Sequence, residues 1–432
     1  KAFPNNIYCA STDNVWGFVL DFFTNWKIGR RMRKTAARIA LAVMLVGLLI
    51  VAIINRNGAL LPDIWVNYYS RSIYPTFSYG FYTFLNYFYF SVTENAVVIL
   101  SIAAIPLVVL FVVSIVKLAK SKGKKALGAF LYKFMVAVLV VALVGVVQFQ
   151  LMFGLNYARD SVSEVLGFEN NESNDDSDEE LLVDEYEAAC EWAYQGMTQA
   201  RSRLGEDYNG VTHIQTNFEE CVYDANACIT AFSEEYGLNL SMNYVRAKPV
   251  SLSNLWSQTA ITGMNNPLFG EAIVNTDNMN SVDFPIALAH EITHARGISR
   301  ENDANFVATM SLCLSSRADF RYAGFLQLYD HFRGVLIMIM DSNADLEVNI
   351  PGDASELAGV NRDLFASYAY WFLLEDYSLS DFINQLAEDT NDAYLESNEQ
   401  EGGTDTYNVP SSMYLDFYLM LVGNEESNES NT

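Results

Sequence analysis

Three long apolar stretches dominate the first third of the chain. They cover residues 39–54, 95–116 and 134–149, and none of them contains a charged residue. Roughly 20 apolar residues are enough for a helix to cross the hydrocarbon core of a bilayer. A helix that is apolar on all sides can also lie in the core of a soluble protein, but three in succession favour the membrane. The pattern predicts a three-helix membrane anchor over residues 36–155, with the lipid bilayer as a partner.

The hydrophobic pattern changes after residue 155. Residues 156–184 are polar and acidic with few apolar anchors, which predicts an exposed linker. Residues 185–422 mix apolar and polar positions as a folded domain does, and helical spacing predominates. Residues 423–432 predict a disordered acidic tail, and residues 1–35 an N-terminal segment on the cytoplasmic side.

Charge divides the chain at the same place. The 432 residues carry a formal net charge of −26. Residues 1–156 contain 15 Lys and Arg against 4 Asp and Glu, whereas the remainder contains 11 against 48. A strongly acidic domain repels phosphate backbones, so nucleic acid is excluded as its partner.

The basic residues also predict the orientation. They gather at residues 30–38, before the first apolar stretch, and at residues 117–133, between the second and third stretches. Basic loops stay in the cytoplasm, so the N-terminus is expected there and the acidic domain outside the cytoplasm. The loop between the first two stretches is rich in aromatic residues that predict an interfacial belt, namely Trp65, Tyr68, Tyr69, Tyr74, Phe77, Tyr79, Phe81 and Tyr82.

The sequence HEITH, residues 290–294, is the one motif that points to chemistry. Asp283 and Pro285 suit the start of a helix that continues into this motif. On a helix, His290 and His294 share one face and can bind one zinc ion. Glu291 then lies beside the open coordination position, where it would act as general base toward water.

A catalytic zinc usually has a third protein ligand, and Glu301 is the expected one. On a continuous helix Glu301 would lie about 10 Å along the axis from His294, so the helix must end between them. Gly297 is the residue expected to end it, with Ser299 capping a second helix that begins near Glu301. Asp303 and Glu271 are the alternative ligands, and Asn305 is expected to orient a ligand histidine.

The residues after the motif carry a resemblance. The stretch HEITHARGISRENDANFVA resembles an uncharacterised family of bacterial multi-pass membrane proteins with a domain of unknown function, in which HExxH is followed by E-x-x-A-N. The stretches FGLNYARD and SNLWSQTAITGMNNPLFGEAIVN extend this resemblance. Over fewer residues the chain is similar to gluzincin-like membrane zinc proteases of the prenyl-protease and heat-shock type, whose third ligand lies in E-x-x-A-D. Asn305 stands where those proteases have Asp.

The resemblance implies a fold and a substrate strand. The expected fold class is mainly α, with three N-terminal transmembrane helices and an α-rich zincin-like domain with a small β element. In zinc proteases an edge strand before the HExxH helix binds an extended peptide, which would place substrate on Gly270, Glu271, Ala272 and Ile273. An ordinary core strand is the alternative. The weaker candidates for stabilising a transition state are His331, Tyr322, Tyr329 and Arg296.

The sequence leaves the function and one disulfide open. For the function, the first hypothesis is a membrane-anchored zinc metallopeptidase acting on a peptide or protein. The alternatives are a non-catalytic zinc-binding sensor or partner-binding protein, and a transporter accessory, although the apolar stretches lack the intramembrane charges expected of a transport pathway. The five cysteines include no C-x-x-C pair, and a local disulfide between Cys221 and Cys228 is one alternative outside the cytoplasm.

Overall fold

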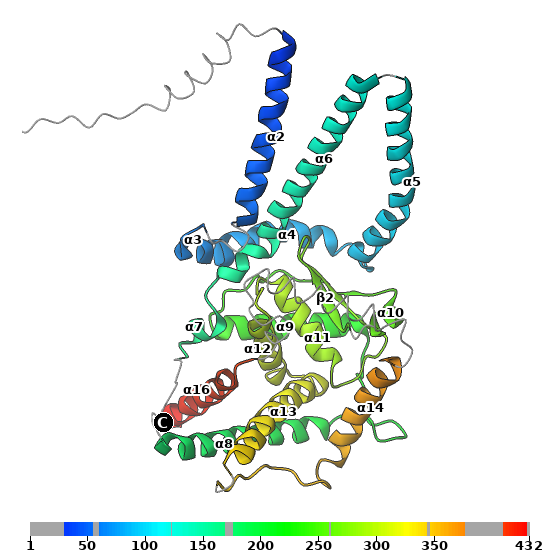
Figure 1. The fold of residues 1–432 in the computed structure, drawn as a ribbon. Coiled ribbons are helices and arrows are strands. Elements are labelled where there is room, and N and C mark those ends of the chain that lie inside the picture. Colours follow the sequence, from blue (N-terminus) through cyan, green and yellow to red (C-terminus); the bar gives the residue numbers. More distant parts are fainter. Residues whose placement is uncertain are drawn as a thin grey trace, which may run out of the picture.

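A computed structural model describes residues 30–54, 60–121, 123–168, 176–258, 261–343, 346–375 and 409–429. Its elements follow one another from a membrane-helix region into a helical domain (Figure 1). They are α2 (Arg30–Ile54), α3 (Asp63–Tyr68), the π-helix η1 (Tyr69–Ile73), α4 (Tyr74–Leu85), α5 (Val92–Ser121), α6 (Gly123–Met152), the 3₁₀ helix η2 (Gly154–Ala158), α7 (Val162–Leu166), α8 (Asp176–Arg201), α9 (Phe218–Glu235), β1 (Lys248–Pro249), α10 (Ser253–Ser257), β2 (Gly263–Asn266), β3 (Glu271–Val274), α11 (Phe284–Ala295), α12 (Glu301–Cys313), α13 (Ala318–Ser342), α14 (Ala358–Glu375) and α16 (Ser411–Glu429).

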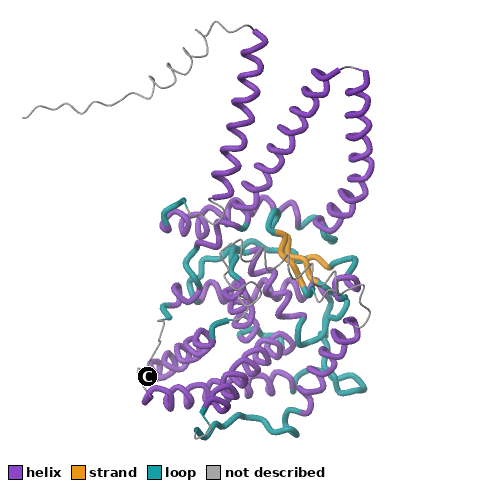
Figure 2. Tube along the Cα trace, in the orientation of Figure 1, coloured by secondary structure: helices purple, strands orange, loops and turns teal. Residues whose placement is uncertain are grey.

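The predicted fold class is confirmed as mainly α with a small β element. The structure is 71% helical, and its sheet has three strands in the order β1-β3-β2. β1 pairs with β3 in parallel, and β2 pairs with β3 antiparallel, with Gly263 opposite Val274. Figure 2 shows this sheet directly beneath the long helices.

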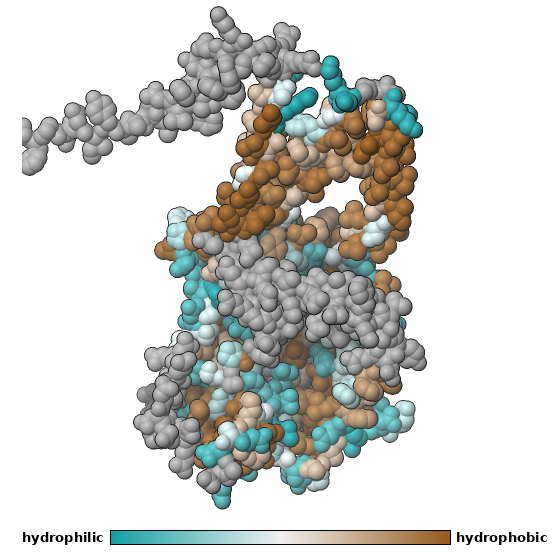
Figure 3. Space-filling view, viewed as in Figure 1, coloured by the Kyte–Doolittle hydropathy of each residue, from teal (hydrophilic) through white to brown (hydrophobic). Residues whose placement is uncertain are grey.

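The three predicted membrane helices are present. The segments Lys34–Ile54, Val92–Lys120 and Lys124–Met152 are long and apolar enough to cross a membrane. Their apolar side chains are exposed over most of their surface, as Figure 3 shows by its hydrophobic colouring. The start of α2 and the turn between α5 and α6 lie at the end away from the helical domain (Figure 1).

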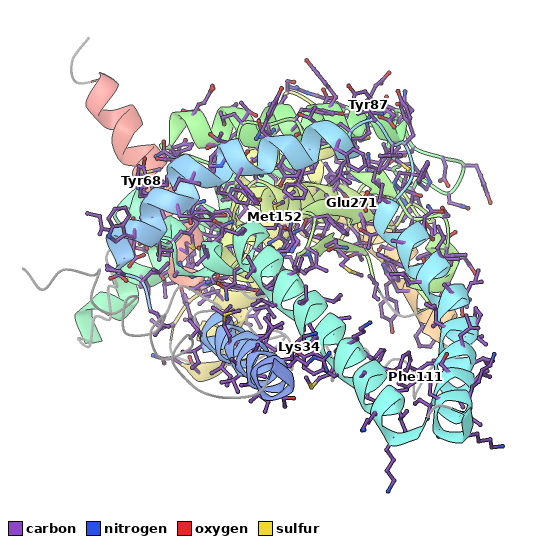
Figure 4. The ribbon with its side chains drawn as sticks, turned by 90° about the horizontal axis from the view of Figure 1, so that it is seen from above. Lys34, Tyr68, Tyr87, Phe111, Met152 and Glu271 are labelled. Atoms are coloured by element: carbon purple, nitrogen blue, oxygen red, sulfur yellow. The ribbon has the colours of Figure 1, made fainter. Side chains whose placement is uncertain are left out.

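A helical segment crosses the base of the long helices, where a loop with an aromatic belt was predicted. α3, η1 and α4 follow one another without a break and lie across the domain between Tyr68 and Tyr87 (Figure 4). Every fourth residue of this segment is buried, namely Val66, Ser70, Tyr74, Ser78 and Tyr82. The opposite face exposes Ile64, Trp65, Tyr68, Tyr79 and Phe84. The segment is therefore amphipathic, as a helix lying at a membrane surface is.

The π-helical turn keeps one face of this segment against the domain. Residues four apart on an α-helix are displaced by about 40° around the axis, so the buried face would drift away over several turns. The wider η1 turn rotates the face in the opposite direction. As a result, Tyr74 and Tyr82 are both buried against the domain rather than placed in the predicted interfacial belt.

The core of the domain lies between packed helices. α13 packs along α8 and against α12, and α12 also packs on α9 and α11. Large buried side chains fill the centre, including Phe232, Phe306, Phe320, Phe332 and Phe417. α11, which carries the HEITH motif, therefore has the sheet on one side and core helices on the other.

Two predicted boundaries are wrong. In the predicted linker, Asn156, Arg159 and Val162 are buried, and a capping box between Ser161 and Glu164 starts helix α7. α8 then begins at Asp176. At the other end, α16 runs to Glu429, so it includes most of the predicted tail. Residues 1–29 and 169–175 lie outside the described residues.

The sheet is joined to α4 and to the membrane helix α5 by two buried charged residues. Lys248 of β1 donates from Nζ to the carbonyl oxygens of Leu85, at 2.9 Å, and Phe88, just beyond the end of α4. Glu271 of β3 accepts from the backbone N–H groups of Val92 and Thr93 at the start of α5. A cation at a helix C-terminus and an anion at an N-terminus are both favoured by the helix dipole.

The local disulfide is absent. Cys221 and Cys228 are free and lie seven residues apart on the single helix α9. Seven residues advance an α-helix by about 10 Å, whereas the Cα atoms of a disulfide lie within roughly 7 Å of each other.

Candidate metal centre

Helix α11 presents the two histidines. It begins after Asp283, with Pro285 in its first turn as predicted, although the Asp283 side chain makes no capping hydrogen bond. Leu288, Ala289 and Ile292 are fully buried in the core, which fixes the rotation of the helix. His290 and His294 are 8% and 4% exposed, so both imidazoles are held in a nearly dry site.

The break after α11 places the third predicted ligand. Gly297 has φ of +106°, a conformation that side-chain-bearing residues rarely adopt, and it follows the end of the helix as predicted. α12 then begins at Glu301 itself. The predicted capping role of Ser299 is wrong, because the Ser299 hydroxyl donates instead to the carbonyl oxygen of Phe153 at 2.8 Å.

His290, His294 and Glu301 converge as predicted. The Nε2 atoms of the two histidines are 2.9 Å apart, and each lies 3.1 Å from Oε2 of Glu301. Among the residues that the structure describes, these three form the one group of His, Cys, Asp and Glu side chains able to hold a metal ion.

The hydrogen bonds behind the imidazoles favour a cation between them. His294 Nδ1 lies 2.7 Å from the carbonyl oxygen of Ile298, which can only accept. His290 Nδ1 lies 2.7 Å from Oδ1 of Asn305, so the Asn305 side chain orients the His290 ring. With both Nδ1 atoms donating, both Nε2 lone pairs point at each other and at a carboxylate. Three convergent lone-pair donors are the arrangement that a bound metal ion stabilises.

The pKa values of the cluster side chains also favour a positive charge between them. Burial alone would lower the pKa of His294. The Glu301 carboxylate has the opposite effect, and this pKa is raised to about 9. Burial raises the pKa of Glu301, yet the two histidines outweigh burial and hold it well below its usual value. The centre therefore attracts positive charge, which a proton or a metal ion can supply.

Glu291 lies beside this cluster on the face toward strand β2. It is 6% exposed, and its Oε2 has no hydrogen-bond partner among the described residues. Burial raises the pKa of Glu291 to about 7, although His290 and His294 lower it. A buried carboxylate with a free oxygen next to a metal site is suited to accept a proton.

Replacing Asn305 by alanine is expected to weaken metal binding by roughly 10- to 100-fold, because His290 loses the acceptor that fixes its tautomer and ring orientation. Asn305→Asp retains an acceptor and should retain affinity. Competition with a chromogenic chelator measures both, and Asn361→Ala, at an exposed position on α14, is the matched control. Unchanged affinity in Asn305→Ala would show that Asn305 does not support the ligand.

The other predicted residues near the reaction are engaged elsewhere. The Tyr322 hydroxyl donates to Asp363 at 2.7 Å, and the Tyr329 hydroxyl to the Pro351 carbonyl at 2.8 Å. The His331 ring packs edge-on against Tyr414. The Arg296 guanidinium donates to the side-chain oxygens of Thr230 and Asn226.

The alternative ligands also have other roles. Asp303 is buried beside Arg300 and accepts from the backbone N–H of Val162. Glu271 accepts from the start of α5. Neither belongs to the metal-ligand group.

The predicted substrate strand is the centre of the sheet. Gly270 lies in the turn before β3, and Glu271, Ala272 and Ile273 belong to β3, which pairs with β1 on one side and β2 on the other. The core-strand alternative is therefore the one found, because β3 lies between two described strands. Within the described residues the edge strand nearest α11 is β2.

Sequence reasoning missed the residues around the cluster that come from distant segments. An ideal Cβ built on Gly263 of β2 would lie 2.7 Å from Cγ and Oε1 of Glu291. The hydroxyls of Tyr74 and Tyr82 donate to the carbonyl oxygen of Ala295. Arg159 donates to the carbonyl oxygen of Gly297 at 3.0 Å. The stretches around Arg159 and Gly263 drew notice through a resemblance, but spacing along the chain could not assign these contacts.

Comparison with known proteins gives one match. A family model described as a protein of unknown function, DUF3810, matches residues 69–411. The match covers most of the chain and includes α4, α5, α6, the sheet and the metal cluster. No curated protein and no solved structure matches the chain.

Proposed function

This chain belongs to the DUF3810 family of proteins of unknown function, and we propose that it is a membrane-anchored zinc-dependent metallopeptidase. The observation that carries the proposal is the convergence of His290, His294 and Glu301, with the unpartnered carboxylate of Glu291 beside them. Two histidines and one carboxylate are the ligand set of several catalytic zinc sites, which keep one position open for substrate or water.

The spacing of the three ligand atoms fits zinc. Tetrahedral coordination with bonds of about 2.0–2.1 Å separates ligand atoms by about 3.3 Å. The three separations in the cluster are 2.9, 3.1 and 3.1 Å. Small outward movements of the side chains would therefore complete the coordination. Nitrogen and carboxylate ligands without thiolate also suit zinc better than calcium or magnesium.

The chemistry divides between the ion and Glu291. When bound, zinc supplies a Lewis acid that makes water nucleophilic near neutral pH. Glu291 Oε2 accepts the proton of the attacking water and then donates it to the leaving amine nitrogen, so the peptide bond breaks without a covalent intermediate on the protein. The free Oε2 of Glu291 supports this role.

Strand β2 is the proposed docking edge for an extended peptide. Its backbone pairs with β3 on one side, and no described strand pairs with its other side. Gly263 at the start of β2 lies against Glu291. An added strand would therefore lead its backbone past the general base.

We also propose the predicted orientation, with the N-terminus in the cytoplasm and the domain outside it. Lys34 lies near the start of α2, and Lys120 and Lys124 flank the turn between α5 and α6. Both places are at the end of the long helices that faces away from the domain (Figure 1). Basic residues at that end support a cytoplasmic location for it.

Gly263→Ala is expected to lower peptidase activity by about 100-fold while zinc binding is retained. The added methyl group would lie 2.7 Å from Cγ and Oε1 of Glu291, so this side chain has to move away from its position beside the cluster. Activity on a peptide and zinc content measure the two effects. Gly334→Ala is the control, since an added Cβ there meets nothing within 4 Å. Full activity in Gly263→Ala would argue against the position assigned to Glu291.

The proposed function is tested on the full-length protein in detergent. The zinc-loaded protein is incubated with a mixed peptide library, and products are identified by mass spectrometry with and without a chelator. Chelator-sensitive cleavage that is absent in Glu291→Gln supports a peptidase. A protein that binds zinc and cleaves nothing would instead be a zinc-binding sensor or partner-binding protein.

A further inference from the structure

The metal cluster lies where the membrane helices end. Phe153 directly follows the last residue of α6, and its ring centroid is 5.6 Å from that of His294. The carbonyl oxygen of Phe153 accepts the hydrogen bond from Ser299, two residues before Glu301. A metal ligand therefore contacts the first residue beyond the third membrane helix.

The amphipathic segment α3–η1–α4 lies next to the same site. Tyr74 and Tyr82 reach from its buried face to the carbonyl oxygen of Ala295, the neighbour of His294. The other face of this segment exposes apolar side chains such as Ile64 and Trp65, at 75% and 62%, as expected at a membrane surface. A helix is about 10 Å across, so the cluster lies roughly one helix diameter below that surface.

Strand β2 leads from the cluster to the membrane helices. At its start, Gly263 abuts Glu291. At its end, the Asn266 side chain donates to the Thr93 hydroxyl at 2.9 Å in the first turn of α5. In the turn that follows, the Leu268 carbonyl accepts from Gln148 of α6 at 2.8 Å. Met152, the last residue of α6, lies against Gly270 in the same turn, next to Glu271 (Figure 4). Three residue steps of strand span about 10 Å.

Asn265, within β2, has an unused amide. It is 9% exposed, and neither Nδ2 nor Oδ1 has a hydrogen-bond partner among the described residues. Side chains two apart on a strand share a face, so Asn265 points to the side on which Gly263 meets Glu291. One amide can donate to and accept from a peptide backbone. The amide is thus positioned for a polypeptide passing from the cluster toward the membrane.

We propose that the substrates are polypeptides anchored in the same membrane, cut at a fixed distance from their anchor. This inference rests on the proposed peptidase function and names its substrate class. The length of β2, together with a headgroup layer of about 5–7 Å, places the scissile bond roughly three to seven residues outside the anchor. The contact of Asn266 with α5 and that of Leu268 with α6 hold the far end of the strand, and Gly263 lies against Glu291 at its start, so the distance is fixed.

The test uses full-length protein in liposomes with synthetic single-span peptides. Each peptide has a Leu/Ala membrane span followed by an outer segment of mixed sequence. In a second set, five Gly/Ser residues are inserted between span and segment. Membrane confinement alone raises the local concentration of any anchored peptide, so rates do not decide the question. The position of the cut, read by mass spectrometry, does.

A fixed distance predicts that the cut keeps its spacing from the span and moves by five residues along the outer sequence. A cut that stays at the same sequence position in both sets overturns the inference and leaves the peptidase proposal standing. The same holds if detached outer segments are cut at the same positions and as fast as anchored ones. If neither anchored nor detached peptides are cut, the peptidase proposal fails first.

Asn265→Ala provides a second readout, measured in the Glu291→Gln background so that peptide is bound and not consumed. Binding of a fluorescent anchored peptide should weaken about tenfold, as for loss of a buried hydrogen-bonding partner. The midpoint of thermal unfolding should not fall, because the amide has no protein partner among the described residues. Asn209→Ala, at an exposed loop position, is the control. Unchanged peptide binding, whatever happens to the midpoint of thermal unfolding, would overturn the role of β2.

Discussion

His294→Ala is expected to lower zinc affinity by more than about 100-fold, so that the purified protein loses its metal on dialysis. Removing a residue that only supports a ligand already costs 10- to 100-fold, and His294 supplies a ligand atom itself. Its Nε2 is within 3.1 Å of both other ligand atoms. Metal analysis by mass spectrometry, expressed per mole of protein, measures the result.

The control for this variant is another histidine. His213 is exposed, lies 3.5 Å from Asp207 and is outside the metal-ligand group, so His213→Ala should retain zinc. Glu301→Gln extends the test to the third ligand and should also lose zinc. Equal zinc in wild type and His294→Ala would contradict the metal centre. Zinc retained in Glu301→Gln alone would contradict only the third ligand.

The convergence of His290, His294 and Glu301 could be predicted from the sequence because it is local. His290 and His294 are one helical turn apart, and the positive φ at Gly297 is a conformation that glycine adopts readily. A helix that ends at Gly297 leaves few residues whose side chains can reach His290 and His294. The tautomer support from Asn305 followed from its position one turn after Glu301. Each of these inferences depends on fewer than twenty consecutive residues.

The surroundings of Glu291 could not be predicted in the same way. Gly263 and Asn265 meet the cluster through the register of β2 on β3, and strand register is a tertiary property in a sheet of this size. The segment 269–275 is predicted as a strand, and its residues 271–274 form β3, which is central because it pairs with a strand on either side. An edge strand carries more polar residues, as the sequence Gly-Met-Asn-Asn of β2 does.

The membrane helices were predictable because a bilayer imposes a length on apolar stretches. The structure of the aromatic segment between the first two membrane helices was harder to predict. Its composition fits both a surface belt and an amphipathic helix, and only packing decides that Tyr74 and Tyr82 turn inward. The linker error has a different cause: the prediction used only the acidic composition of the segment, whereas the S-x-x-E pattern of Ser161 and Glu164 is typical of a helix start.

Two buried charges join the sheet beside the His290–His294–Glu301 cluster to α4 and to α5. Lys248 holds the end of α4, and Glu271 holds the start of α5. β3, which carries Glu271, also pairs with β2, which touches Glu291. The surroundings of Glu291 are therefore part of the same sheet that is joined to α4 and α5.

Glu291→Gln is expected to lower peptide cleavage by between about 100- and 10 000-fold, the usual range for loss of a general base. The amide has the same shape as the carboxylate but cannot accept and return a proton. Glu291 is not one of the three metal ligands, so zinc content should stay at the wild-type level. Replacing a buried carboxylate that lacks a partner at Oε2 should not lower thermal stability.

Three measurements on Glu291→Gln therefore separate its role from that of the ligands. Cleavage falls, zinc remains and the unfolding midpoint is retained, whereas His294→Ala loses zinc as well. Glu219→Gln, in an exposed ion pair with Arg246, is the matched carboxylate control. If Glu291→Gln retained full activity, water would have to be activated by another group, and the buried free oxygen of Glu291 would have no part in the reaction.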